Sequence, residues 1–328
     1  MDVLTVDGVF VVGISACVPP TSVDNLAACT SVYGDVAKAA SVVKATGIRH
    51  RRVVEAGTTS LDLCCAAAKK LLSDVKCPPN EIGALVSVSF TPARQMPCNA
   101  CAAQARLGLP TGVMAFDINL ACSGYAYGLY MAGLLARQTG KKVLLLDGDT
   151  QTTFTDPKDV ATVPVLADAG TATLVAPCAH VGAPWKFAFL SDGAKGDVLT
   201  LPHGGTIAMD GFGIFKFVAM DVSKFIKQFL AETRVEVDAF IPHQANVYMI
   251  EQLSKMLKID HEKLWVSGDE LGNSCSATVP TTIAYVGKTL PAASRRLLIS
   301  GFGGGLSASV GWLTLDAGCH FSCFDYEG

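Results

Sequence analysis

Apolar positions along the chain follow two alternating periods. Short and almost wholly apolar runs at 84–90 and 142–149 are typical of buried strands. Between such runs, the segments 61–72, 222–232 and 247–257 place apolar residues at helical spacing. Strands that alternate with helices predict an α/β fold, in which helices cover parallel or mixed sheets. The pattern predicts a further helix around 98–107 and further strands at 113–118, 239–242, 265–268 and 296–303.

The segment 118–136 carries no charge and is long enough to cross a bilayer. However, it contains Asn119, Ser123 and several glycines and tyrosines, and Asp117 directly precedes it. We therefore interpret it as a helix buried between layers of a large protein, not as a membrane span.

The chain also repeats itself once. Residues 81–90 resemble 236–245, residues 117–128 resemble 269–280, and residues 141–149 resemble 295–303. Each match is weak alone, but the nearly constant offset predicts two related halves. We place them at 1–175 and 176–328, and we expect them to pack as one unit because no Pro- or Ser-rich linker separates them.

Composition narrows the classes of function. The chain has 328 residues, is 50% apolar and only 17% charged, and carries a formal net charge of −3. This balance argues against nucleic acid or an anionic membrane as the main partner. The 12 cysteines are too sparse for a disulfide-built scaffold. Cys98 and Cys101 form a C-x-x-C pair, but no second pair stands at zinc-ligand spacing, so no metal is expected.

Three positions could do chemistry together. Cys122 lies where a strand ends and the long helix begins, so helix N–H groups and the helix dipole would favour its thiolate. His243 directly follows an apolar strand, and Asn273 stands at the equivalent of the Cys122 region in the other half. The alternatives are a buried cysteine, a structural histidine and a helix-capping asparagine. The glycines of SGFGGG (300–305) could aim a backbone N–H at a substrate oxygen, or could form only a turn.

These residues resemble those of a known family. Cys122 in ACSGYAYG, His243 in PHQAN, Asn273 in GNSCSATVP and the run 302–305 stand in the order and spacing of beta-ketoacyl-acyl-carrier-protein synthase III enzymes. Further segments match at TGIRHRR (46–52), LADAGTATLV (166–175) and GFGIFKF (211–217). The resemblance implies the thiolase fold, an internally duplicated five-layer α-β-α-β-α sandwich. It also implies a cytoplasmic homodimer.

The resemblance further implies a decarboxylating condensation. Cys122 would take an acyl group from a thioester, and malonyl-thioester would lose carbon dioxide to give an enolate. His243 and Asn273 would donate hydrogen bonds to the enolate oxygen, and the N–H groups of Cys122 and Gly304 would form an oxyanion hole. Phe302 would pack beside the thiol and keep the site dry. No cofactor is expected beyond the thioester substrates, and acyl carrier protein is the expected partner.

Departures from the family pattern concern how the substrate is held. A Trp and an Arg that hold coenzyme A in relatives are missing from SVVKATGIR (41–49), and Val160 stands where a further Arg is usual. Lys44 and Lys158 offer charge but no planar stacking surface. We therefore expect either that the acyl donor arrives on a carrier protein or that coenzyme A binds in a different position.

The family implies two further substrate contacts, Asn246 and Met96. Met96 stands where relatives often have a Phe that reaches across the dimer to the acyl pocket. Lys216 and Lys255 match basic positions that meet the carrier protein.

Two other functions compete with condensation. An acyltransferase would keep the acyl-Cys122 intermediate but pass the acyl group to an alcohol or amine. A non-catalytic partner subunit would need no cysteine, and the presence of all three catalytic positions counts against it. Asn at 273, where some non-condensing relatives carry Asp, favours condensation.

Overall fold

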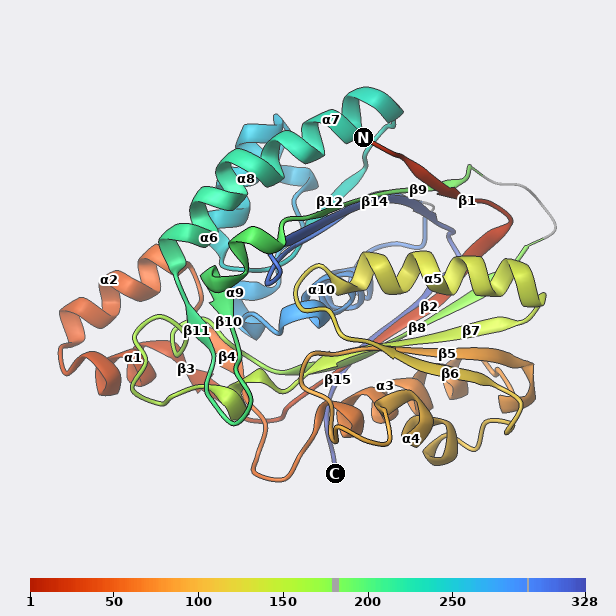
Figure 1. Cartoon of the computed structure of the whole chain (residues 1–328), viewed down its shortest axis with the longest axis horizontal. Coiled ribbons are helices and arrows are strands. Elements are labelled where there is room, and N and C mark those ends of the chain that lie inside the picture. Colours follow the sequence, from red (N-terminus) through yellow and green to blue (C-terminus); the bar gives the residue numbers. More distant parts are fainter. Residues whose placement is uncertain (179–182, 294) are drawn as a thin grey trace.

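The computed structural model describes residues 1–178, 183–293 and 295–328. Two β-sheets are stacked, with helices below, between and above them (Figure 1). From bottom to top the layers are helices, a six-stranded sheet, helices, a five-stranded sheet and helices. The five-layer α-β-α-β-α arrangement expected from the sequence is therefore confirmed.

The six-stranded sheet forms the lower of the two. Its order is β15 (His320–Asp325), β2 (Val9–Val18), β8 (Ala169–Pro177), β7 (Lys142–Asp149), β5 (Ile82–Val88) and β6 (Met114–Ile118). β5 pairs in parallel with both β7 and β6, whereas β8 runs antiparallel to β7 and β2. The interior strands are almost wholly buried, which explains why they read as continuous apolar runs.

The five-stranded sheet lies above it. Its order is β1 (Leu4–Val6), β9 (Trp185–Ser191), β14 (Ser307–Leu315), β13 (Arg295–Gly303) and β12 (Ala239–Pro242). The two ends of the chain exchange sheets. β1, from the N-terminal half, pairs with β9 in the five-stranded sheet, and β15, from the C-terminal half, pairs with β2 in the six-stranded sheet. The division at residue 175 falls inside β8 and stays a prediction.

Two helices fill the layer between the sheets, α5 (Gly124–Thr139) and α10 (Thr278–Gly287). A Cβ at Gly128 would lie 2.7 Å from Leu145 on β7, and a Cβ at Gly133 would lie 2.9 Å from Val6 on β1. Glycine therefore lets α5 approach both sheets, and its apolar character is that of a core helix, as predicted. Within the described ranges, no helix combines the length and apolar character needed to cross a bilayer.

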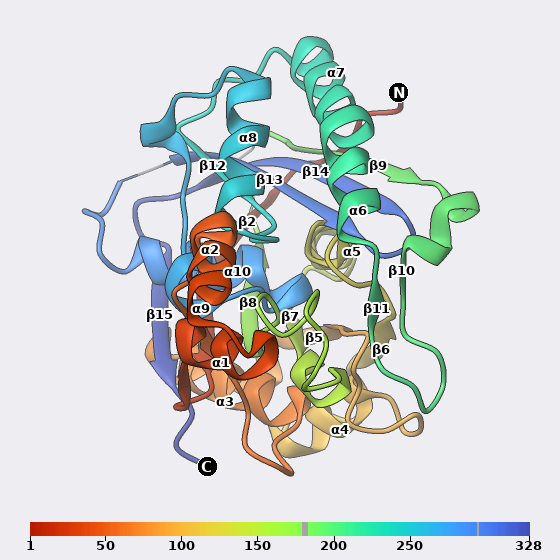
Figure 2. The same cartoon turned by 90° about the vertical axis from the view of Figure 1, so that its left-hand side faces the viewer.

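The outer layers and the smaller elements complete the molecule. Below the six-stranded sheet lie α3 (Ser60–Asp74) and α4 (Asn99–Arg106). Above the five-stranded sheet lie α6 (Gly211–Phe217), α7 (Ser223–Thr233) and α8 (Val247–Leu257). At one side, seen face-on in Figure 2, are α1 (Asn25–Tyr33), α2 (Val36–Thr46) and α9 (Gly268–Leu271). Two short hairpins pair β3 (Ser22–Asp24) with β4 (His50–Arg52) and β10 (Leu199–Thr200) with β11 (Ala208–Met209).

The predicted strand at 265–268 is wrong. Only an isolated bridge joins Leu264 to Phe240 of β12. Beyond it, the side-chain oxygen of Gln244 accepts hydrogen bonds from the N–H groups of Ser267 and Gly268, at 3.2 and 3.3 Å. The Gln244 side chain therefore takes the hydrogen bonds that a neighbouring strand would otherwise accept. The backbone then continues into α9.

Candidate active site

Cys122 lies in the turn between β6 and α5, one residue before the helix N-cap Ser123. Ser123 makes no side-chain capping bond, so the first N–H groups of α5 have no capping partner from it. The positive end of the helix dipole therefore faces the Cys122 thiol, as the sequence predicted.

The end of β13 lies directly against this turn. A Cβ at Gly301 would lie 2.5 Å from the Cys122 carbonyl oxygen and 2.6 Å from Ser123 Cα, and one at Gly303 would lie 2.9 Å from both Cβ and Sγ of Cys122. Real Cβ atoms do not approach neighbours this closely, so only glycine fits at both positions. The glycine run is thus required for β13 to reach the nucleophile.

A second thiol lies beside the first. Cys275 Sγ is 3.5 Å from Cys122 Sγ, and both residues are buried. The hydrogen bond from Cys275 holds the pKa of Cys122 well below its usual value, and the nearby His243 acts in the same direction against the opposing effect of burial. Burial raises the pKa of Cys275, so Cys122 is the sulfur that ionises.

His243 enters the site directly after β12. Its backbone N–H donates to the Ser300 carbonyl at 2.7 Å, which ties the turn to β13. Its Nδ1 lies 2.7 Å from Thr278 Oγ1, and that hydroxyl donates to the Cys275 carbonyl at 2.8 Å. Because Thr278 has only one hydroxyl hydrogen, both contacts are satisfied only when Nδ1–H donates to Thr278. Nε2 is then the nitrogen left for chemistry.

Asn273 is held by its backbone and by its side chain. Its N–H donates to Val165 at 3.0 Å, and its carbonyl accepts from Ala167 at 2.7 Å. The side-chain Oδ1 accepts from the Cys275 N–H at 2.9 Å, and Nδ2 donates to the Ala245 carbonyl at 3.4 Å. Because Oδ1 is already engaged, the second hydrogen of Nδ2 is the one left for a ligand.

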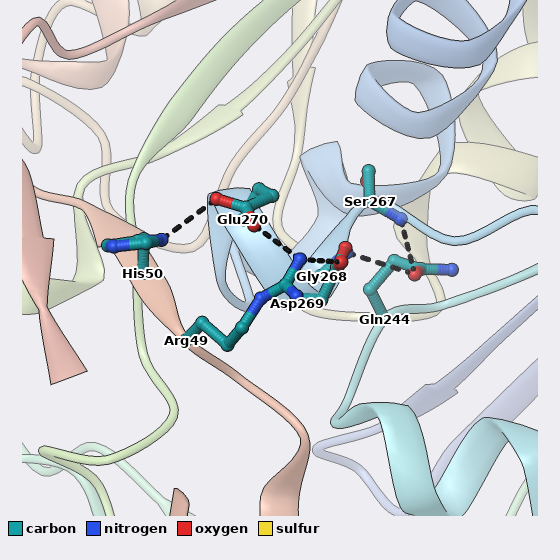
Figure 3. A network of polar contacts seen from close by, with 7 residues as sticks. All are labelled: Arg49, His50, Gln244, Ser267, Gly268, Asp269 and Glu270. Atoms are coloured by element: carbon teal, nitrogen blue, oxygen red, sulfur yellow. Dashed lines mark hydrogen bonds and ion pairs between the residues drawn. The ribbon is translucent and has the colours of Figure 1, made fainter. Parts of the chain in front are cut away.

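Figure 3 shows a polar network around α9, the short helix that precedes Asn273. The network also includes Gln244, the residue after His243. The buried side chain of Gln244 accepts hydrogen bonds from the N–H groups of Ser267 and Gly268 at the start of α9. From the opposite side, Arg49 forms ion pairs with Asp269 and Glu270 of α9, at 2.9 and 2.5 Å. His50 Nδ1 also contacts Glu270, at 2.8 Å. The helix that leads to Asn273 is therefore fixed between the segments 46–52 and 243–246.

A cavity of about 350 Å³ opens onto these groups. Cys122, His243, Asn273 and Cys275 all line it. Its remaining wall is largely apolar and comes from several elements, including Phe90, Val165, Leu166, Leu199, Ile207, Met209, Ile214 and Met249. A mainly apolar cavity with a few polar groups at one place suits an acyl chain that ends in a reactive carbonyl.

Most of the predicted site residues meet at this cavity. Besides the three catalytic candidates, the lining includes Gly304, Phe302 and Asn246. Phe302 is buried and packs edge-to-face against the His243 ring, with centroids 5.4 Å apart. Asn246 also caps α8, since its side chain accepts from the Met249 N–H at 2.8 Å.

Three predicted residues lie elsewhere. Met96 is 86% exposed and does not line the cavity of its own chain. Lys216 on α6 and Lys255 on α8 are exposed. The roles given to these residues depend on a second chain or a carrier protein and stay predictions.

Cys275 and Thr278 were not expected at the site. Both stand in GNSCSATVP, the segment that carries Asn273, so their place in that motif was the available signal. Their partners, Cys122 and His243, come from distant parts of the chain, so residue spacing alone gives neither contact. Among the described residues, no group of three or more His, Cys, Asp or Glu side chains is arranged as a metal site.

A thiol at a helix N-terminus, with an imidazole and a carboxamide in the same cavity of a fold built from two stacked sheets, is typical of a thiolase-type acyl-transferring enzyme. Comparisons with known proteins identify the family within this class. Residues 116–193 match the family profile of 3-oxoacyl-[acyl-carrier-protein] synthase III, and residues 231–314 match the profile of its C-terminal part.

Individual relatives agree with the profiles. The chain is 34% identical over 290 residues to beta-ketoacyl-[acyl-carrier-protein] synthase III of Nitratidesulfovibrio vulgaris, covering 80% of this chain and 86% of the relative. It is 30% identical over 316 residues to synthase III 2 of Streptomyces coelicolor, covering 93% and 94% of the two chains.

Among solved structures, the 3-oxoacyl-(acyl-carrier protein) synthase of Burkholderia xenovorans superposes with a TM-score of 0.94 at 32% identity, covering 99% of both chains. The priming beta-ketosynthase of a polyketide pathway superposes with a TM-score of 0.86 at 25% identity, covering 96% of this chain and 98% of that one. The protein therefore belongs to the beta-ketoacyl-[acyl-carrier-protein] synthase III family of condensing ketosynthases, with the thiolase fold.

Proposed function

We propose that this ketosynthase takes an acyl group onto Cys122 from an acyl carrier protein and condenses it with a malonyl thioester. One observation carries the proposal: the Cys122 thiol, the His243 ring and the Asn273 amide open onto the same cavity. The thiol is buried at the N-terminus of α5, where its ionised form is favoured.

The first step is acyl transfer. His243 Nε2 takes the thiol proton of Cys122, since Nδ1–H is already engaged with Thr278. The Cys122 thiolate attacks the thioester carbonyl, and the tetrahedral oxyanion lies between the N–H groups of Cys122 and Gly304. The bond to the carrier sulfur breaks, and that sulfur leaves as a thiolate that takes a proton from water.

The second step forms the carbon–carbon bond. The carboxylate of the malonyl thioester leaves as carbon dioxide, and its bonding electrons move into an enolate. His243 Nε2–H and Asn273 Nδ2–H donate to the enolate oxygen. The enolate carbon then attacks the acyl carbonyl on Cys122, and the tetrahedral intermediate expels the Cys122 thiolate to release a beta-ketoacyl product.

Backbone hydrogen bonding supports the assignment of the oxyanion hole. In the part of the chain that the structure describes, neither the Cys122 N–H nor the Gly304 N–H donates to another backbone or side-chain group. Both residues line the cavity, so these donors are available to a substrate oxygen. One donor of this kind is typically worth ~3–4 kcal/mol of transition-state stabilisation.

The carrier dependence rests on the residues around the expected coenzyme A position. α2 offers Lys44 in its last turn, and Val160 is exposed on a neighbouring loop. Neither side chain gives the flat surface on which adenine stacks. Exposed Lys216 and Lys255, on the helices that flank the cavity, suit an acidic carrier protein.

The proposed homodimer has support at the edge of the six-stranded sheet. β6 is an edge strand, and its apolar residues Met114, Ala115, Phe116 and Ile118 are exposed or half-buried in the single chain. An apolar edge strand of this kind pairs readily with a second copy. In such a dimer, exposed Met96 is available to the acyl pocket of the partner.

The decisive experiment is intact-protein mass spectrometry with a panel of acyl-carrier proteins and the matching acyl-CoA esters, followed by malonyl-carrier protein. We expect Cys122 to gain the acyl mass from the carrier, and a beta-keto product with release of carbon dioxide to follow. A Cys122→Ala variant is the control. Transfer of the acyl group to an alcohol or amine without carbon dioxide would contradict condensation. Acylation by micromolar acyl-CoA but not by acyl-carrier protein would contradict the choice of donor.

A further inference from the structure

The two thiols at the centre of the site form a close and unequal pair. Cys275 Sγ lies 3.5 Å from Cys122 Sγ, inside hydrogen-bonding distance for sulfur. Cys275 has a φ of 57°, in the left-handed region that non-glycine residues rarely adopt. Its N–H is fixed by Asn273 Oδ1 at 2.9 Å. A side chain held in a costly backbone conformation against a reacting atom is the kind of feature that marks functional sites.

The surroundings decide which sulfur carries the charge. Cys122 lies at the N-terminus of α5 and close to the His243 ring, and both favour an anion. Burial raises the pKa of Cys275, and the negative charge on Cys122 and on Asp149 of β7 raises it further. Asp149 is ionised at neutral pH, because burial raises its pKa only to about 6. The pair therefore holds one negative charge on Cys122 and one hydrogen on Cys275.

We propose that Cys275 is a positioning residue whose S–H donates to Cys122 Sγ, holding the nucleophile as a thiolate before acylation and stabilising it again when it leaves after carbon–carbon bond formation. The inference rests on the proposed function, in which Cys122 attacks and later leaves as a thiolate. Cys275 itself forms and breaks no covalent bond. In the acyl-enzyme, Cys122 is a thioester sulfur and a poor acceptor, so the hydrogen bond acts mainly on the ionised states.

The test measures the reactivity of Cys122 as a function of pH without any acyl substrate. The full chain is treated with iodoacetamide between pH 4 and 10, and alkylation of the Cys122 peptide is followed by mass spectrometry. Removing the donor in Cys275→Ala should raise the pH of half-maximal alkylation by about one to two units, the equivalent of a hydrogen bond to a charged group. Cys275→Gly should raise the half-maximal pH by the same amount. Glycine also adopts the left-handed backbone conformation of this position without strain. The glycine variant therefore still tests the inference if the alanine variant does not fold.

Two further variants separate hydrogen bonding from packing. Cys275→Ser keeps a donor and should restore at least half of the shift. Cys65→Ala removes an equally buried thiol from α3 and should leave the profile unchanged. In single-turnover acylation, Cys275→Ala should be about tenfold slow at pH 6.5 and nearly normal at pH 9.5, because the thiolate then forms without help. A purely structural defect would slow both equally.

Unchanged half-maximal pH in both Cys275→Ala and Cys275→Gly would overturn the inference, as would a serine variant shifted as far as alanine. The failure of the proposed function looks different. In that case the wild type would be alkylated with the low half-maximal pH, yet Cys122 would accept no acyl group from any thioester.

Discussion

Replacement of Gly303 by alanine should disable the nucleophile without unfolding the protein. The new Cβ would lie 2.9 Å from both Cβ and Sγ of Cys122, whereas ordinary van der Waals contact begins near 3.4 Å. Cys122 or the end of β13 must therefore move by roughly 0.5–1 Å. Overpacking of this kind typically costs about 1–3 kcal/mol of stability, and a reacting atom displaced by about 1 Å can lose roughly 100-fold in rate.

A matched control lies in the same hairpin. A Cβ at Gly311 on β14 would meet Phe187 at 2.9 Å and Ile299 at 3.0 Å, so Gly311→Ala is crowded equally but away from the thiol. Thermal unfolding should show similar losses of Tm for both variants. Single-turnover acylation of Cys122 should fall about 100-fold in Gly303→Ala and stay within about threefold of wild type in Gly311→Ala.

The reasoning is refuted if Gly303→Ala acylates Cys122 at the wild-type rate. It is also refuted if Gly311→Ala loses as much acylation as Gly303→Ala, because the loss would then follow general stability and not the position of the thiol.

Three other predictions test separate parts of the site. His243→Ala should lower malonyl decarboxylation, measured as carbon dioxide release, by at least 100-fold. Acylation of Cys122 in this variant, measured by acyl-enzyme mass, should recover at high pH. Equal loss of decarboxylation and acylation at every pH would contradict the role of His243. Burial raises the pKa of Asp147, which has no hydrogen-bond partner among the described residues, so the folded state keeps its proton above the ordinary Asp pKa and stability falls as the pH rises through that range. Asp147→Asn should reduce that slope in guanidinium unfolding at pH 5, 6 and 7, leaving the part due to Asp149, whose pKa burial raises to about 6, and an unchanged slope would be the contrary result. Charge reversal of Lys216 and Lys255 to Glu should raise KM for acyl-carrier protein about tenfold but leave KM for a small pantetheine thioester unchanged; equal effects on both donors would rule out carrier contact.

The layers of the fold were largely predictable because they depend on local patterns. The runs at 84–90 and 142–149 became β5 and β7 with small shifts at their ends, and the uncharged segment 118–136 became most of α5. The segment 265–268 was mispredicted because its backbone hydrogen bonds are taken by Gln244, a side chain more than 20 residues away. Such a competitor leaves no trace in the apolar pattern.

The sequence by itself determined the chemical types at the site, since Cys122, His243 and Asn273 each follow a strand or precede a helix in a recognisable motif. The tertiary structure alone decided which nitrogen of His243 is free and which of two adjacent sulfurs ionises. Both outcomes depend on partners that meet only when the two sheets stack: Thr278 for the imidazole, and Cys275 for the nucleophile. Ionisation responds to distances of a few ångströms, and residue spacing along the chain does not contain those distances.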